Sequence, residues 1–184
     1  LHLSLRRQRQ MCIRDRIQLA RQLTQLRVVA TASRAETRAW CLELGAHLVI
    51  DHSKPLAAEL KAAGIAEVDM VASLTQTEQH YAQIIESLKP QGQLAVIDDM
   101  KTLDAMPLKT KSLSLHWEMM FARSRFETPD IAEQGALLAE VAALVDAGRV
   151  RTTANASFGT INAANLRRAH APVSYTHLTL PTKA

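Results

Sequence analysis

The sequence predicts a doubly wound α/β domain, in which parallel strands alternate with helices along the chain. Short apolar runs rich in Val, Ile and Ala alternate with segments whose apolar residues recur at helical spacing. Glycine or proline stands at several of the junctions between them. Strands separated by helices of about three turns favour right-handed crossovers and a parallel sheet.

The first half of the chain predicts three helices and two strands. Ile17, Ala20 and Leu23 have the spacing of one helix face, and RVVATA has the composition of a short buried strand. Gly45 stands where a helix commonly ends, and Pro55 fits the first turn of a helix because its missing N–H costs nothing there. The expected elements are a helix over 17–26, a strand over 27–32, a helix over 34–44, a strand over 47–51 and a helix over 55–64.

The second half continues the alternation and then changes rhythm after Asp99. Pro90-Gln91-Gly92 is expected to form a turn, and Gly148 is expected to end a long helix. The expected elements are a strand over 68–73, a helix over 78–89, strands over 93–97 and 111–115, a helix over 129–147, an extended segment over 151–157 and a helix starting in 163–170.

Composition and charge argue for an ordinary globular domain without a nucleic-acid partner. The chain has 184 residues, of which 47% are hydrophobic, and a net charge of +4. Five arginines fall within residues 1–16, so the rest of the chain is close to neutral and lacks the clustered basic face that phosphate backbones need. No run approaches the ~20 apolar residues of a membrane span. Two cysteines, Cys12 and Cys41, form no disulfide framework, which favours a cytoplasmic location.

A glycine-rich phosphate-binding turn is absent from the sequence. Doubly wound dinucleotide sites place such a turn between the first strand and the first helix, where bare backbone approaches the pyrophosphate. The glycines stand at positions 45, 64, 92, 135, 148 and 159, and residues 1–16 contain none. If the first strand is also missing, the strands expected over 27–32 and 68–73 keep unpaired inner edges. The alternating LHLSL of residues 1–5 is an alternative filler for that gap.

From Ile17 to His170 the sequence resembles the zinc-type alcohol dehydrogenase-like, quinone oxidoreductase branch of the medium-chain dehydrogenase/reductase superfamily. The matching phrases occur in family order: IQLARQLTQLRVVATASRAET, LGAHLVIDHSKPL, ESLKPQGQLAVIDD, KSLSLHWEMMFARS, LVDAGRVRTT and FGTINAANLRRAH. In that family a GGAGGVG turn precedes the first helix and a catalytic domain precedes the turn. The resemblance therefore implies an incomplete Rossmann fold that lacks the usual first strand and glycine-rich turn.

The two ends of the chain do not share this resemblance. RRQRQMCIRDR and PVSYTHLTLPTKA resemble translated sequencing-adapter sequence, and a divergent natural terminus is the alternative. The expected organisation is a non-family segment over 1–16, a truncated dinucleotide-binding domain over 17–150, a stub of the catalytic domain over 151–172 and a non-family segment over 173–184.

The resemblance implies that Ser33, Arg34 and His52 lie at the adenosine end of a cofactor. NAD enzymes place an acidic residue near the end of this strand for the ribose 2′-hydroxyl, whereas a basic residue accommodates the 2′-phosphate of NADP. Arginine offers a fork of donors that suits phosphate. The alternative is a purely structural role, in which Ser33 and Glu36 form a capping box and Arg34 is a solvated side chain. For His52 the alternative is a loop histidine that binds no ligand.

Five further residues follow the third and fourth strands and are expected along the ribose and nicotinamide. They are Ser73, Leu74, Thr75, Ile97 and Asp98. Ligands of open parallel sheets lie outside the carboxyl ends of the strands. Asp98 and Asp99 also resemble a carboxylate pair for acid–base work. Exposed turn aspartates are more common, and the resembling enzymes need no such pair.

The segment SLHWEMMF corresponds to the nicotinamide side of the pocket in the resembling enzymes. Leu115, His116 and Trp117 are the implied contacts, mainly through backbone, and His116 is also a candidate proton donor. Met119, Met120 and Phe121 are expected to pack or to lie in a dimer interface. The strand over Lys111–Leu115 often pairs with its twin across a homodimer in this superfamily. The scattered histidines and cysteines predict no zinc site in this chain.

The sequence thus predicts the cofactor-binding part of an NADPH-dependent oxidoreductase. The resemblance implies hydride transfer from NADPH to a small carbonyl, quinone or activated alkene such as an enone, in an enzyme whose cofactor carries the chemistry. Without the glycine-rich turn and the substrate pocket, this chain alone is expected to be inactive. The alternative is a non-catalytic Rossmann-like interaction or dimerisation module, because such folds host many functions.

Overall fold

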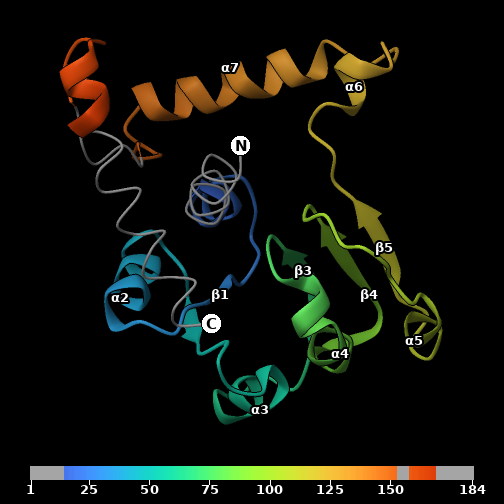
Figure 1. The fold of residues 1–184 in the computed structure, drawn as a ribbon. Coiled ribbons are helices and arrows are strands. Elements are labelled where there is room, and N and C mark those ends of the chain that lie inside the picture. The colour runs from blue at the N-terminus through green and yellow to red at the C-terminus, as the bar shows by residue number, and fades with distance from the viewer. Residues whose placement is uncertain (1–14, 153–157, 169–184) are drawn as a thin grey trace.

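The computed structural model describes residues 15–152 and 158–168 (Figure 1). Residues 15–23 and 163–168 are helical, and strands alternate with helices between them. The elements are β1 (Val29–Thr31), α2 (Ala35–Glu43), β2 (Leu48–Ile50), α3 (Leu56–Ala62), β3 (Val68–Ser73), α4 (Thr77–Ser87), β4 (Leu88–Val96), α5 (Met106–Lys109), β5 (Ser114–Trp117), α6 (Ala122–Arg125) and α7 (Glu133–Asp146).

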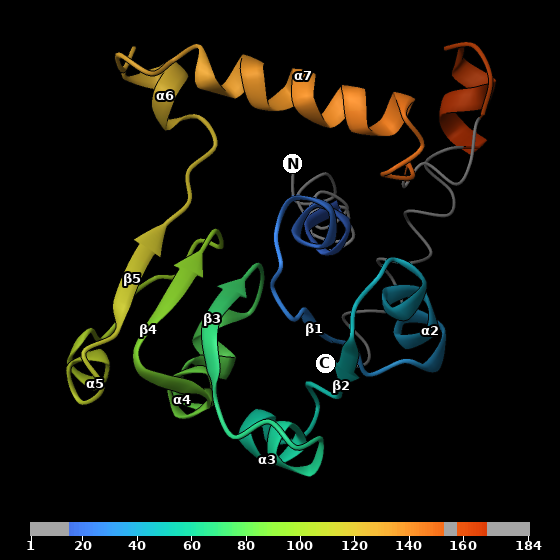
Figure 2. The same cartoon turned by 180° about the vertical axis from the view of Figure 1, so that it is seen from behind.

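The strands form two separate parallel sheets. β1 pairs with β2, and β3, β4 and β5 pair in that order, with every described pairing parallel. The expected doubly wound α/β architecture is confirmed, and so is its incompleteness. In space, none of the described strands lies in the gap between β1 and β3, as both views show (Figures 1 and 2). Among the residues that the structure describes, β1 and β3 therefore each keep one edge unpaired, which is the arrangement expected if the first strand is missing. Residues 1–5, the alternative filler, lie outside the described residues.

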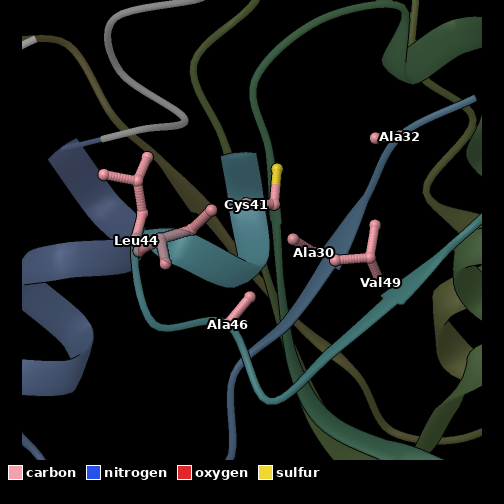
Figure 3. Close-up of a cluster of buried hydrophobic side chains, with 7 residues drawn as sticks. Ala30, Ala32, Cys41, Leu44, Ala46 and Val49 are labelled. Carbon is pink, nitrogen blue, oxygen red and sulfur yellow. The ribbon is translucent and has the colours of Figure 1, made fainter. Parts of the chain in front are cut away.

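Each sheet has a hydrophobic core of its own. Around β1 and β2 the core contains Ile17, Ala30, Ala32, Cys41, Leu44, Ala46 and Val49, most of which are labelled in Figure 3. Around β3, β4 and β5 it contains Ile84, Leu88, Leu94 and Val96, with Leu115 among the half-buried residues packed against it. Burying one such leucine or valine contributes about 1.5–3 kcal/mol. Cys41 is a core residue, as expected, and its thiol is free.

The predicted turn at Pro90–Gly92 lies inside β4 as an outward bulge. The pairing moves from Val68 opposite Leu88 directly to Met70 opposite Gln93, so the residues between are looped out of register. Gln91 has a φ of 64° and donates its backbone N–H to the Lys111 carbonyl at 2.7 Å. The predicted helix is present as α4 and the predicted strand as the 93–96 part of β4, and Gln91 adopts a turn conformation between them. The prediction differs from the structure in that Leu88 already pairs with β3, so the turn lies within β4, and local turn chemistry does not show such a pairing.

A turn before β5 shifts that strand toward the carboxyl terminus of its predicted range. β5 covers Ser114–Trp117 rather than 111–115. Ser112 adopts a φ of 52°, and Lys111 instead directs its ammonium group to the carbonyl of Glu86 at 2.9 Å. Residues 111–113 therefore form a bend held by a lysine contact that the apolar pattern does not reveal.

The carboxyl-terminal third differs from the prediction mainly at helix boundaries. α7 begins at Glu133 and not at Pro129, because Asp130 is held in a turn by Thr128 at 2.6 Å and by Arg123 at 2.8 Å. The four-residue helices α5 and α6 were not predicted. Residues 153–157 of the expected extended segment and 169–170 of the last helix lie outside the described residues. Among the helices described, none is long and apolar enough to cross a membrane.

Candidate functional site

The carboxyl ends of the parallel strands carry the candidate site residues. Ser33 and Arg34 follow β1, Asp51 and His52 follow β2, and a third group follows β3, β4 and β5. Because parallel strands in one sheet end at the same edge, the first and second groups lie in adjacent loops of one sheet, and the third group lies in the adjacent loops of the other sheet.

Ser33 and Arg34 present free polar groups between β1 and α2. Both are exposed, and within the described ranges neither side chain has a hydrogen bond or an ion pair. Arg34 is the residue that caps α2, with an extended backbone and no side-chain cap bond. The first N–H groups of α2 therefore lack a side-chain acceptor, which is an arrangement that suits an anion.

The alternative interpretation of Ser33 as part of a capping box was wrong. The helix begins one residue later than that box requires, at Ala35, and its cap position is occupied by Arg34. A capping box needs the serine side chain on the first turn's N–H groups. The hydroxyl of Ser33 consequently remains available to another partner.

Arg38 fastens the loop that carries Ser33 and Arg34. Its guanidinium donates to the carbonyl of Ala32 at 3.2 Å and to the carbonyl of Val49 at 2.9 Å. These bonds tie the end of β1 to the end of β2. Sequence reasoning missed Arg38, although its position four residues after Arg34 places both arginines on the same face of the helix start.

The end of β2 forms a compact polar turn. Asp51 accepts hydrogen bonds from the backbone N–H of Ser53 at 2.9 Å and from its hydroxyl at 2.7 Å, and these bonds lower the pKa of Asp51 below its usual value. The ring of His52 contacts the ring of His80 edge to face, with centroids 6.2 Å apart. Burial, and then the charge of His52, lower the pKa of His80. His52 thus packs against α4, and its role toward a ligand stays a prediction.

A buried hydrogen-bond chain joins the ends of β3 and β4 to the start of α4. Asp98 accepts a bond from the backbone N–H of Thr77 at 3.1 Å and one from its hydroxyl at 3.0 Å. Because the Thr77 hydroxyl proton is used on Asp98, the hydroxyl of Ser73 donates to Thr77, at 2.7 Å. All three residues are buried, and Thr77 is completely so. Asp98 therefore caps α4 from a different strand.

This chain of bonds changes the interpretation of two predicted residues. Asp98 is 9% exposed, so the expectation of an exposed turn aspartate was wrong for it, while Asp99 is exposed. Both carboxylate oxygens of Asp98 are occupied, and Ser73 is occupied as well. Thr77 was not among the predicted site residues, although a threonine at a helix start is a common capping signal.

The other residues of these loops are positioned by the buried chain. The backbone N–H of Ile97 donates to the carbonyl of Ser73 at 3.2 Å, which holds the two loops together. Leu74 is buried, Ile97 is half-buried and Thr75 is exposed. The strand ends consequently present a fixed apolar edge, with Thr75 as its accessible polar residue.

A small cavity lies where β4 and β5 end. Its volume is about 180 Å³, and it is lined by Val96, Ile97, Asp98, Asp99, Met100, Trp117, Glu118 and Met119. The backbone N–H of Glu118 donates to the carbonyl of Val96 at 2.8 Å and closes one side. The structure thus brings three predicted residues, Ile97, Asp98 and Trp117, to one hollow.

Leu115 and His116 are not part of this cavity. Side chains alternate along a strand, so His116 points to the opposite face of the sheet from its neighbours. Leu115 is half-buried and packs against the second core, whereas His116 is exposed. The geometry therefore does not support His116 as a proton donor to a ligand in this cavity.

The comparisons with known proteins agree with this arrangement of strands and loops. The sequence profile of the zinc-binding dehydrogenase family matches residues 44–177. The chain belongs to that family. A zinc-type alcohol dehydrogenase-like protein of Staphylococcus aureus is 34% identical over 146 residues, which are 79% of this chain and 44% of the relative.

Two solved structures share the fold of the chain. A Rhizobium etli protein of the zinc-dependent alcohol dehydrogenase type is 51% identical, with a TM-score of 0.81 over 89% of this chain and 48% of that protein. The Escherichia coli quinone oxidoreductase, solved with NADPH, has the same fold at 17% identity and a TM-score of 0.63, over 77% of this chain and 44% of its own. The chain spans less than half the length of these relatives.

Despite the family's name, the described residues contain no cluster of three or more histidine, cysteine or acidic side chains that could hold a metal ion. A second and larger cavity, of about 360 Å³, includes Arg21, Glu43, Gly45 and Arg151 in its lining. Gly45 precedes β2, so this cavity lies at the amino ends of the strands, away from the edge where open parallel sheets bind ligands. The smaller cavity is the better candidate site.

Proposed function

We propose that this chain is the cofactor-binding part of an NADPH-dependent oxidoreductase that reduces a small carbonyl, quinone or enone. The observation that carries the proposal is the pair of free polar side chains, Ser33 and Arg34, beside a helix start without a side-chain cap. A hydroxyl, a guanidinium and helix N–H groups together form a set of donors that suits a phosphate. The end of β1 carries no acidic residue of the kind that selects NAD.

The other residues at the strand ends are proposed to align the rest of the cofactor. Leu74, Thr75 and Ile97 would lie along the ribose and nicotinamide, and Trp117 would bound the nicotinamide side of the small cavity. Asp98 and Ser73 are proposed to act as positioning residues, because their polar side-chain atoms already bond to Thr77. When bound, NADPH would supply the hydride.

The pyrophosphate of the cofactor fits this chain poorly. The residues before helix 15–23 contain no glycine, and any side chain there would keep the backbone from approaching the linked phosphates. We therefore propose that the 184-residue chain alone binds the adenosine end weakly and has no reductase activity. We also propose that a truncated dinucleotide-binding domain covers residues 17–150 and that part of a catalytic domain covers 151–172. This organisation likewise leaves the chain alone without reductase activity.

The activity test uses the purified 184-residue chain with NADPH and a benzoquinone, followed by NADPH absorbance. The matched arm fuses the part of the Rhizobium etli protein that precedes helix 15–23 to Ile17 of this chain. We expect turnover in the fusion and none in the chain alone. Turnover by the chain alone would contradict the proposed need for the upstream part. If the folded fusion failed to oxidise NADPH with every carbonyl, quinone and enone supplied, that result would contradict the proposed reaction.

The binding test separates the 2′-phosphate from the rest of the nucleotide. Titration with 2′,5′-ADP and with 5′-AMP, followed by NMR shifts, should show tighter binding of 2′,5′-ADP. Replacing Arg34 with alanine removes one charge-assisted contact, worth about 1.5 kcal/mol at an exposed position, so the preference should fall roughly tenfold. Arg27→Ala is the matched control, since Arg27 is exposed at the other end of β1. Equal effects of the two substitutions would refute the assignment of Arg34.

The edge strand β5 is also proposed to mediate a homodimer. Within the described residues its outer edge pairs with no strand, and Trp117, Met119, Met120 and Phe121 near its end are more than half exposed. Of the two expected roles of these methionines and Phe121, packing or an interface, their exposure favours the interface. Light scattering of the fusion protein, with Ser114→Pro as the variant that disrupts an edge strand, tests the dimer.

A further inference from the structure

Three arginines line the larger cavity, which lies at the opposite end of the strands from the candidate cofactor site. Arg21 belongs to helix 15–23, and Arg149 and Arg151 belong to the segment that follows α7. Among the described residues that line the cavity, Glu43 is the one acidic residue. Positive side chains are therefore in excess, and because like charges repel, a bound anion would lower the electrostatic energy of this wall.

Arg149 and Arg151 are held in place by the ends of two helices. The guanidinium of Arg149 donates to the side-chain oxygen of Gln22 at 3.2 Å and to its backbone carbonyl at 3.5 Å. The guanidinium of Arg151 donates to the carbonyl of Glu43 at 3.3 Å and lies 4.0 Å from its carboxylate. Carbonyls at helix ends lack partners within the helix, so these bonds satisfy them. Each guanidinium has more N–H donors than these bonds use, and the remaining donors can serve a ligand.

A buried amide fixes the backbone that carries Arg151. Gln18 is 6% exposed, and its side chain donates to the carbonyl of Arg151 at 3.1 Å and accepts from its N–H at 2.8 Å. Helix 15–23 lies beside α2 and the carboxyl end of α7 in both views (Figures 1 and 2). The wall is thus built by the tertiary fold, from residues that are distant in the sequence.

Arg21 is positioned through its stem while its charged end stays unused. In the part of the chain that the structure describes, its guanidinium has no hydrogen bond or ion pair. Its stem lies against Gly45, where an added Cβ would come within 3.2 Å of the Cγ of Arg21. Gly45, at a φ of 102°, leaves room for this approach. A guanidinium offered in this way suits the paired oxygens of a carboxylate or a phosphate.

We propose that the larger cavity binds a small organic anion that carries at least two carboxylate or phosphate groups. Two negative charges match the excess of positive side chains in the lining. The volume of about 360 Å³ lies at the lower end of the range of roughly 300–1,000 Å³ that small-molecule sites occupy. Capping of helix ends accounts for the bonds of Arg149 and Arg151, but it gives Arg21 no role. The site lies away from the loops proposed to hold NADPH, so this proposal is independent of the proposed function.

The experiment titrates the purified 184-residue chain with citrate and with fructose 1,6-bisphosphate at constant ionic strength, followed by NMR shifts. Acetate is the control anion with a single charge. We expect saturable binding of at least one of the two probes, with shifts at the amides of Gly45, Arg149 and Arg151. Binding of citrate alone would identify a carboxylate site, and binding of the bisphosphate alone would identify a phosphate site.

Three variants test the residues. Arg21→Ala should weaken binding roughly tenfold, because one charge-assisted hydrogen bond is lost, and Arg21→Lys, which keeps the charge, should weaken it less. Arg125→Ala is the matched control, since it removes the same charge from an exposed position in α6 and should leave binding unchanged. Arg21 is exposed and makes no bond, so both of its variants should unfold at the urea concentration of the parent chain.

Four results would overturn the proposal. They are the absence of saturable binding by both probes, equal affinity for acetate, equal weakening by Arg21→Ala and Arg125→Ala, and shifts confined to the loop after β1. The last result would place the anion at Ser33 and Arg34, which belong to the proposed cofactor site. Shifts at Gly45 that persist in Arg34→Ala would separate the two sites and support the proposal.

Discussion

Replacing Asp98 with alanine is expected to destabilise the chain more than any change at its neighbour Asp99. The substitution leaves the backbone N–H of Thr77 without its acceptor, and the Thr77 hydroxyl loses its bond to the carboxylate and keeps only the Ser73 hydroxyl as a partner. Thr77 has no solvent access that would let water replace the carboxylate. The buried N–H left unsatisfied costs about 1–3 kcal/mol and the lost hydroxyl bond about 1 kcal/mol more, so the total is roughly 2–4 kcal/mol. In a domain of this size that corresponds to a fall in Tm of roughly 5–15 °C.

The assay is urea unfolding followed by far-UV circular dichroism, with Asp99→Ala as the matched control. The control residue is exposed, so its replacement should stay within about 0.5 kcal/mol. A double-mutant cycle of Asp98→Ala and Thr77→Val should give a coupling energy of roughly 1–3 kcal/mol, because the two side chains form one hydrogen bond with each other. If Asp98→Ala and Asp99→Ala unfold at the same urea concentration, the buried cap does not contribute to stability and the reasoning fails.

Three further predictions concern the core, the loop after β1 and pH. Leu94→Ala, at a completely buried position, should lower the free energy of unfolding by about 2–5 kcal/mol, whereas Leu138→Ala, at a residue that is 62% exposed, should change it by under about 0.5 kcal/mol; equal urea midpoints would contradict this. Arg38→Ala should speed amide exchange at Val49 and in the loop after Ala32, and unchanged exchange would show that its two carbonyl bonds do not hold the loop. The lowered pKa of His80 means that the unfolded chain binds a proton more readily, so stability is complete above pH 6.5 and declines as pH falls below it; His80→Gln should flatten this decline, and an unaltered slope would refute it.

Much of the fold was predictable because short apolar runs alternate along the chain with segments of helical spacing. The strand over 68–73 was predicted with the bounds that β3 has, and Gly45 ends its helix region with a φ of 102°. The two separate sheets of the described residues are the arrangement expected if the first strand is missing. The bulge at Pro90–Gly92 and the shift of β5 were not predictable, because both depend on contacts between distant residues, such as the bond from Gln91 to Lys111.

The candidate site was predictable in position and less so in chemistry. Loops after parallel strands meet at one edge, so Ile97, Asp98 and Trp117 were found together at one cavity. That Asp98 is buried against a helix start was not visible, since its partner Thr77 stands 21 residues earlier in the chain. Arg38 was missed for a similar reason, because it bonds to backbone carbonyls, which carry no sequence signature.

The sheet of β1 and β2 and the sheet of β3, β4 and β5 each have their own hydrophobic core, and this division affects how the molecule would unfold on heating. Cooperativity in a small protein comes from a shared interior, and here Cys41 and Leu44 lie in one interior while Ile84 and Leu88 lie in the other. Heating should therefore release the two halves at different temperatures, with α3 as the hinge between them. Calorimetry would then record a transition broader than a single enthalpy can describe.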